Sequence, residues 1–74
     1  MADLAKLLGN HIRMTAAVEA ACRYLDRLIK KNGTVRPSEA LPFLERRYPD
    51  VDREAALPLI RERYAELARR GRRH

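Results

Sequence analysis

A nine-residue pattern occurs twice in the second half of the chain. Residues 40–48 and 56–64 both read Ala-Leu-Pro, two large apolar residues, two charged residues, Arg and Tyr. This spacing predicts two similar amphipathic helices, joined by a turn at Pro49 and Asp50. A proline inside a helix removes a backbone hydrogen bond, so we expect the same arrangement in both copies: a first turn, the proline, then the packed helix. A short helix, a tight turn and a second, Arg-rich helix is also the plan of a helix-turn-helix.

The clearest single helix is predicted between His11 and Lys31. Its apolar residues recur at intervals of three and four, and charged residues fill the opposite face. Glu19 is expected to pair with Arg23, and Asp26 with Lys30, since residues four apart are neighbours on a helix.

Helix starts and stops define the other elements. A short N-terminal helix capped by Asp3 is expected over residues 2–9, with a stop or kink at Gly9-Asn10 and a second stop at Asn32-Gly33. After an extended segment at Thr34-Val35, Pro37 opens the next helix, which either begins late, near Leu41, or kinks at Pro42. Asp52 is the expected cap of the last helix, with Val51 packing onto Ala56, and Gly71 ends it before a basic tail over residues 71–74. No longer strand pattern occurs, so the predicted class is all-α, with three principal helices and the short N-terminal one.

Chain length and cysteine content limit the core and the compartment. Seventy-four residues make one small domain, and eleven of its apolar residues are Ala, so the core should be thin. A homodimer would relieve this marginal stability. Because Cys22 is the only cysteine and no apolar run could cross a bilayer, we expect a cytoplasmic protein, prokaryotic or viral in style.

Residues for catalysis or metal binding are not grouped in the sequence. His11 and Cys22 lie about three turns apart on one predicted helix, Cys22 on its apolar stripe and His11 near the surface. There is no glycine-rich phosphate loop, Cys-x-x-Cys or paired acid motif. We therefore expect no enzyme activity, no metal site and no cofactor.

Arginine is concentrated toward the C-terminus, and the net charge is +6. Lysine and arginine near phosphates release condensed counterions, and the arginine fork donates two parallel hydrogen bonds to phosphate or guanine. The alternative is a solvated face on which Glu45, Glu54, Glu62 and Glu66 neutralise the arginines. The candidate nucleic-acid-binding residues are Arg36, Arg46, Arg47, Arg53, Arg61, Arg63, Arg69, Arg70, Arg72 and Arg73.

Three segments resemble prokaryotic winged-helix regulators of the helix-turn-helix type. Residues 24–40 resemble the first helix, glycine break and second-helix start of that family, 51–55 the capped start of its recognition helix, and 64–71 the helix end before the wing. The resemblance implies that Arg53 and Glu54 lie near base edges, and that Arg36, Arg61, Arg63 and the basic tail lie near phosphates. The chain lacks a wing hairpin, and Pro58 lies where that family has an unbroken recognition helix.

Two functions are therefore expected from different classes. The first is a small, regulatory helix-turn-helix protein, dimeric and bound to duplex DNA. The second is a phage-type helical inhibitor that binds a host protein or ribonucleoprotein, of the anti-CRISPR or polymerase-binding kind. In that case Tyr48 and Tyr64 would dock on the partner, because aromatic residues are frequent in binding hot spots.

Overall fold

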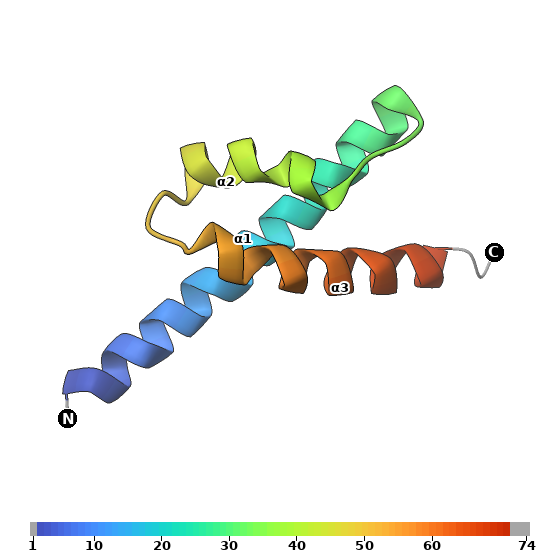
Figure 1. The fold of residues 1–74 in the computed structure, drawn as a ribbon. Coiled ribbons are helices and arrows are strands. Elements are labelled where there is room, and N and C mark those ends of the chain that lie inside the picture. Colours follow the sequence, from blue (N-terminus) through green and yellow to red (C-terminus); the bar gives the residue numbers. More distant parts are fainter. Residues whose placement is uncertain (1, 72–74) are drawn as a thin grey trace.

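The structure, a computed structural model, describes residues 2–71, with side chains from Gly9 to Arg70, and every regular element in this range is helical. Three α-helices and one 3-10 helix follow in order: α1 (Ala2–Asn32), η1 (Pro37–Ala40), α2 (Leu41–Arg47) and α3 (Arg53–Gly71). Helix α1 lies diagonally across the molecule, and the other elements pack against its later turns, while its first turns extend beyond them (Figure 1). The predicted all-α class is confirmed.

Helix α1 is continuous, so the expected short N-terminal helix is not a separate element. The predicted stop or kink at Gly9-Asn10 was wrong: the helix runs through both residues, and Gly9 does not have a positive φ. Glycine inside a helix costs only about 1 kcal/mol relative to alanine, which the neighbouring helix formers can offset. The side chains of the predicted N-terminal arm lie outside the described residues. The stop at Gly33 is confirmed, because Gly33 has φ +84° and its N–H donates to the Ile29 carbonyl at 2.8 Å.

The first proline of the repeat lies at a helix start. The 3-10 helix η1 opens at Pro37, and the backbone N–H of Arg36 donates to Glu39 Oε2 at 2.7 Å. Helix α2 then begins at Leu41, with Pro42 in its first turn, which confirms the late start rather than a kink. Before η1, Thr34 and Val35 form no strand, but Val35 packs against the core.

The second proline lies inside a helix. Both copies have the expected order of a first turn, the proline and the packed helix, but the first turn is the separate 3-10 helix η1 in one copy and part of α3 in the other. Helix α3 begins at Arg53, and Asp52 caps it as predicted, its Oδ1 accepting from the Glu54 N–H at 3.0 Å. The helix then continues through Pro58, an exposed residue. Arg72–His74, which make up most of the predicted basic tail, lie outside the described residues.

The core is as thin as the alanine content predicts. Its largest fully buried side chains are Leu25 of α1, Leu44 of α2 and Ile60 of α3. Cys22 is 2% exposed, which confirms its expected place on the apolar stripe, and Val51 and Ala56 are buried on either side of the α3 cap. The other buried residues are Ala17, Val18, Ala21 and Ala40. Four of the ten core residues are alanine, so the helices approach closely but bury little area each.

Candidate functional site

The candidate arginines separate into paired and unpaired groups. Arg63 Nε donates to Glu19 Oε1 at 2.9 Å, Arg63 Nη1 lies 3.5 Å from Glu66 Oε2, and Arg70 Nη2 donates to Glu66 Oε1 at 2.8 Å. The hydrogen bond that Arg63 donates to Glu19 raises the pKa of Arg63. Arg72 and Arg73 lie outside the described residues. Six candidates are exposed and form no ion pair with any carboxylate in the described part of the chain: Arg36, Arg46, Arg47, Arg53, Arg61 and Arg69.

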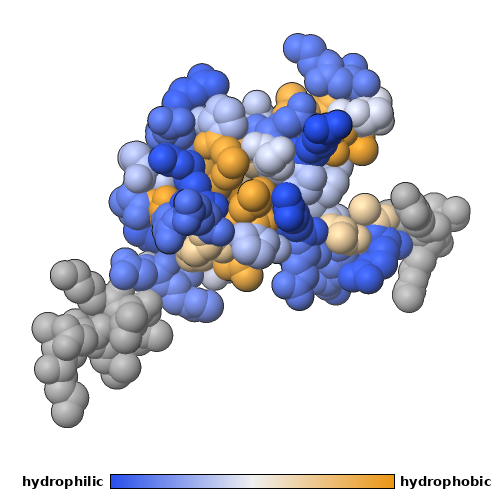
Figure 2. Space-filling model, viewed as in Figure 1, coloured by the Kyte–Doolittle hydropathy of each residue, from blue (hydrophilic) through white to orange (hydrophobic). Residues whose placement is uncertain are grey.

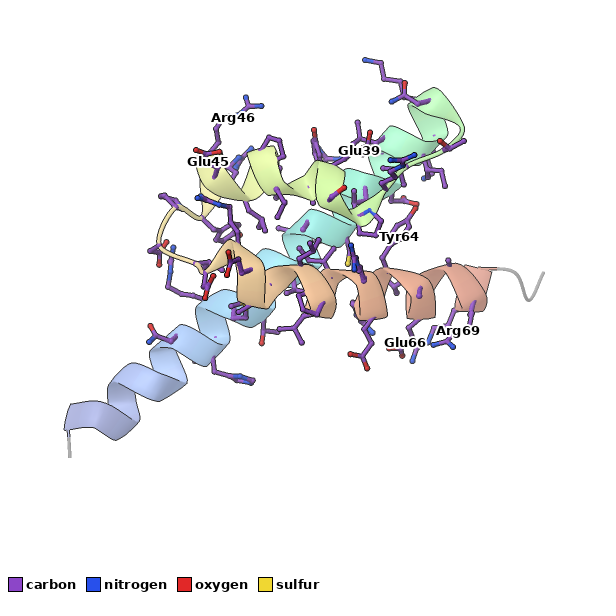
Figure 3. All side chains as sticks on the ribbon, in the orientation of Figure 1. Glu39, Glu45, Arg46, Tyr64, Glu66 and Arg69 are labelled. Carbon is purple, nitrogen blue, oxygen red and sulfur yellow. The ribbon has the colours of Figure 1, made fainter. Side chains whose placement is uncertain are left out.

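These six arginines do not form one continuous surface. Figure 3 shows Arg46 on α2 and Arg69 near the C-terminal end of α3, at opposite sides of the molecule. Arg61 and Arg69 share the outward face of α3 with the exposed residues Glu54 and Glu62. On the face of the molecule seen in Figure 2, hydrophilic side chains surround an apolar centre. The outward face of α3 therefore carries both signs of charge.

Three arginines do gather in one place, between α1 and α2. Arg23 and Arg27 are one turn apart on α1, and they line the same small hollow as Arg47 at the end of α2. The hollow has a volume of about 150 Å³, and its other lining residues are Ala20, Tyr24, Phe43 and Tyr48. No carboxylate lines this arginine pocket among the described residues. Arg23 and Arg27 were not among the candidates from the sequence.

Aromatic rings form the walls of the arginine pocket. Tyr24 and Phe43 are stacked, with their centroids 4.8 Å apart and their planes at 14°. The Arg13 guanidinium lies 5.8 Å from the centroid of the Tyr48 ring. Arg13 also binds both carboxylate oxygens of Asp50, with Nη2 to Oδ1 at 2.6 Å, and this hydrogen bonding lowers the pKa of Asp50. These contacts join α1 to the α2–α3 turn and hold the rings in place.

The expected pairing of Glu19 with Arg23 was wrong. Glu19 pairs instead with Arg63, which lies 44 residues away on α3, whereas the predicted pair of Asp26 and Lys30 is present at 3.3 Å. Both carboxylates that lie near Arg23 in a neighbouring hollow, Glu19 and Asp26, thus already have a cationic partner. Arg23 consequently keeps its charge unpaired within the described chain.

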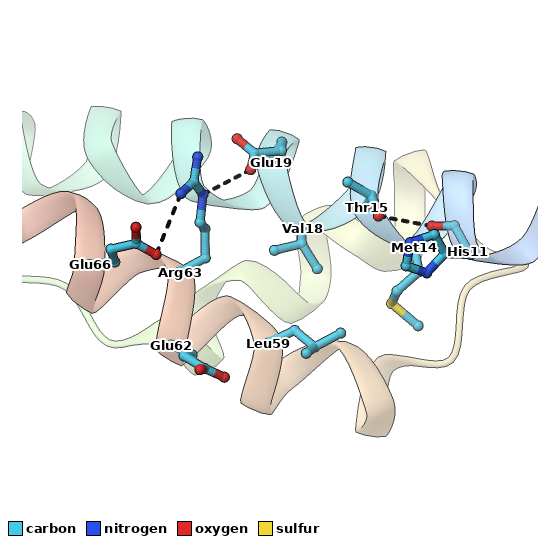
Figure 4. A pocket seen from close by; sticks show the side chains of 9 residues that line it. All are labelled: His11, Met14, Thr15, Val18, Glu19, Leu59, Glu62, Arg63 and Glu66. Atoms are coloured by element: carbon cyan, nitrogen blue, oxygen red, sulfur yellow. Dashed lines mark hydrogen bonds and ion pairs between the residues drawn. The ribbon is translucent and has the colours of Figure 1, made fainter.

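A further hollow lies between earlier turns of α1 and α3. Figure 4 shows Met14, Val18 and Leu59 around it, with Arg63 bridging Glu19 and Glu66 at one end. Its volume is about 290 Å³, and the other lining residues are His11, Thr15 and Glu62. Leu59 is 44% exposed, and Ile12, which follows His11 on α1 without lining the hollow, is 67% exposed. This α1–α3 groove is apolar in its centre and acidic along its rim.

The two candidate tyrosines lie in different places. Tyr48 lines the arginine pocket, and Tyr64 lines a hollow beside Cys22. Both rings are partly buried against the core. Burial raises the pKa of the Tyr64 hydroxyl and that of the Cys22 thiol. The pair therefore does not form one exposed aromatic patch.

The sequence indicates only two of the three arginines of the pocket. Arg23 and Arg27 are four apart beside the small residue Ala20, which indicates a basic stripe on α1. Nothing in the local pattern indicates that Arg47 would join them, or that Glu19 would turn toward α3. Among the side chains that the structure describes, no three His, Cys, Asp or Glu residues gather where they could hold a metal ion.

Comparisons of the chain with protein-family models, with curated proteins and with solved structures found no match. Within residues 2–71, none of the helices is both long enough and apolar enough to cross a membrane.

Proposed function

We propose that this protein binds nucleic acid, duplex DNA in particular, chiefly through contacts with backbone phosphates. The supporting observation is the net charge of +6 together with six exposed candidate arginines that have no carboxylate partner in the described residues, although these arginines do not form one continuous surface (Figure 3). Contacts of this kind depend on charge and not on base sequence. A regulatory role, in which the capped start of α3 at Arg53 and Glu54 approaches base edges, is the specific form of this proposal.

The salt dependence of binding tests the proposal. Anisotropy of a short labelled duplex should show binding at low salt, and the affinity should fall steeply as salt is added. Each arginine that contacts a phosphate contributes about 0.9 to the slope of log K against log salt. The double variant Arg46→Gln/Arg53→Gln should therefore make the slope shallower by up to about 1.8.

A matched control removes the same charge from paired arginines. Arg63→Gln/Arg70→Gln should change the slope less, because these side chains are already bound to Glu19 and Glu66. Circular dichroism would show that both variants keep their helices. Absence of duplex binding at low salt, or equal changes of slope in the two variants, would contradict the proposal.

The α1–α3 groove favours a second candidate function. In it, this protein is a phage-type helical inhibitor, and a host protein binds in the groove. Leu59, which lines the groove and is 44% exposed, supplies apolar contact area. Affinity capture from a lysate treated with nuclease separates the two functions. A partner that survives nuclease and is lost from the Leu59→Glu variant would support protein docking over DNA binding.

A further inference from the structure

We propose that the arginine pocket is a phosphate-binding site, and that its ligand is a backbone phosphodiester of nucleic acid. Arg23, Arg27 and Arg47 would each donate hydrogen bonds to its anionic oxygens. This inference rests on the proposed function, but it places the main contact between α1 and α2 instead of on α3.

The first observation that supports this site is the grouping of three positively charged residues. Three arginine residues from two helices line one hollow of about 150 Å³, without a carboxylate in its described lining. Arginines four residues apart on a helix repel one another weakly, and Arg47 adds a third like charge. An anion held between them replaces this repulsion with attraction and with charge-assisted hydrogen bonds.

Three acidic residues that lie close in sequence to pocket residues already have cationic partners. Glu19 is held by Arg63, Asp26 by Lys30 and Asp50 by Arg13. A carboxylate that already has a cationic partner competes less strongly for Arg23 and Arg27. Ion pairs elsewhere thus hold these three carboxylates, and no carboxylate lines the pocket among the described residues.

Fixed aromatic walls are the second observation. The stack of Tyr24 on Phe43 and the contact of Arg13 with Tyr48 join α1, α2 and the following turn around the pocket. Rings held by two elements restrict the space into which the arginine side chains can fold. The hollow is also small, so a phosphate group can enter while the rest of its ligand stays outside, as a point on a continuous backbone would.

A polyanion fits the surroundings better than free inorganic phosphate does. Exposed Arg46 precedes Arg47, and the chain carries a net charge of +6. A nucleic-acid backbone has further phosphates that can contact the arginines outside the pocket, so these contacts add to the affinity of the pocket itself. Free phosphate would gain only the contacts with the three pocket arginines.

The experiment compares two double variants that remove the same charge. Arg23→Gln/Arg27→Gln removes two pocket arginines, and Arg61→Gln/Arg69→Gln removes two exposed arginines of α3 that have no ion pair in the described chain. With a labelled random duplex at one fixed low salt concentration, the pocket variant should bind about tenfold more weakly than the control variant. Equal losses of affinity in the two variants would contradict a binding site at the pocket, because net charge alone would then explain the binding.

Nuclear magnetic resonance locates the contact directly. Adding the same duplex to the intact chain should shift the Arg23, Arg27 and Arg47 Nε–Hε signals, and inorganic phosphate at equal phosphate concentration should shift them far less. Duplex binding without shifts at the pocket would overturn this inference while leaving the proposed function standing. No duplex binding at all would overturn both, and pocket shifts with inorganic phosphate alone would overturn the assignment to nucleic acid.

Discussion

Glu19 determines which arginine keeps an unpaired charge. On an isolated helix its nearest cation is Arg23, four residues ahead, but in the folded chain it accepts from Arg63 of α3. Exposed pairs four apart stabilise a helix by only a few tenths of a kcal/mol, so a partly buried alternative easily displaces them. Arg63 and Glu19 are 33% and 38% exposed, which favours the bond that joins two helices.

Asp50 makes acid stability testable at a single residue. Hydrogen bonding from Arg13 lowers the pKa of Asp50 in the folded chain, so the ionised carboxylate stabilises the fold. This contribution is fully present above the unfolded pKa of about 3.9 and is lost as the pH falls through the lower folded pKa. We expect Asp50→Asn to be less stable than the native chain at neutral pH, with the difference disappearing in acid.

Urea midpoints measured from neutral pH down through this acid range check the expectation. Both side chains of the pair are about half exposed, so added salt should shrink the effect. Glu45→Gln is the matched control, because Glu45 is exposed and forms no ion pair in the described chain. A difference between Asp50→Asn and the native chain that is the same at every pH would contradict the role of this pair.

At the scale of elements, α1 and α3 show that a helix breaker acts only where its surroundings allow it. Gly33 ends α1 because its positive φ turns the chain toward Pro37 and η1. Gly9 lies inside the same helix without ending it. Pro58 likewise lies inside α3, whereas Pro42 lies in the first turn of α2.

Replacing the two glycines by alanine should have opposite effects. Gly33→Ala forces a side chain into the left-handed region and should destabilise the fold by about 1–2 kcal/mol. Gly9→Ala meets no atom within 4 Å and should increase helix content, since alanine is favoured by about 1 kcal/mol in a helix interior. Circular dichroism and thermal unfolding measure both effects. A fall in helix content for Gly9→Ala would contradict a continuous α1 and favour the predicted stop or kink at Gly9-Asn10.

The two prolines of the repeat should also differ. Pro58 removes the N–H that would bond to the Glu54 carbonyl inside α3, so Pro58→Ala should stabilise the fold by about 1–3 kcal/mol. Pro42→Ala should change stability by less than about 1 kcal/mol, because N–H groups in the first turn have no partner within the helix. Chemical denaturation distinguishes the two. Equal shifts would mean that the prolines act alike, as the repeat predicts.

Over the whole molecule, a long helix serves as the support for a small core. The elements after α1 pack on its later turns, while its first turns project beyond them (Figure 1). A projecting helix gains little from tertiary packing, and isolated short helices are marginal in water. The expected homodimer, which would cover such a segment, stays a prediction.

Core truncation should remove a large part of the total stability. A domain of this size has a free energy of unfolding of about 4–11 kcal/mol, and Leu25→Ala should cost about 2–5 kcal/mol because Leu25 is fully buried. Leu67→Ala is the control, since Leu67 is 37% exposed and should cost much less. Urea unfolding compares the two variants. Similar costs would show that the core is not where the structure places it.

Local signals in the sequence were sufficient for the class and for several boundaries. The absence of strand periodicity, the apolar stripe through Cys22, the stop at Gly33 and the cap at Asp52 all depend on residues within one or two turns of each other. Interactions over that range are nearly the same in a peptide and in the folded chain, so the pattern predicts them.

Tertiary structure decided what those signals left open. Whether Gly9 and Pro58 break their helices depends on the balance between a local cost and the packing of the whole element. The arginine pocket depends on the packing of α1 against α2. It also depends on the hydrogen bond between Glu19 and Arg63 of α3, which leaves Arg23 unpaired in the described part of the chain. Residues 44 positions apart meet only through the geometry of helix packing, which no spacing along the chain records.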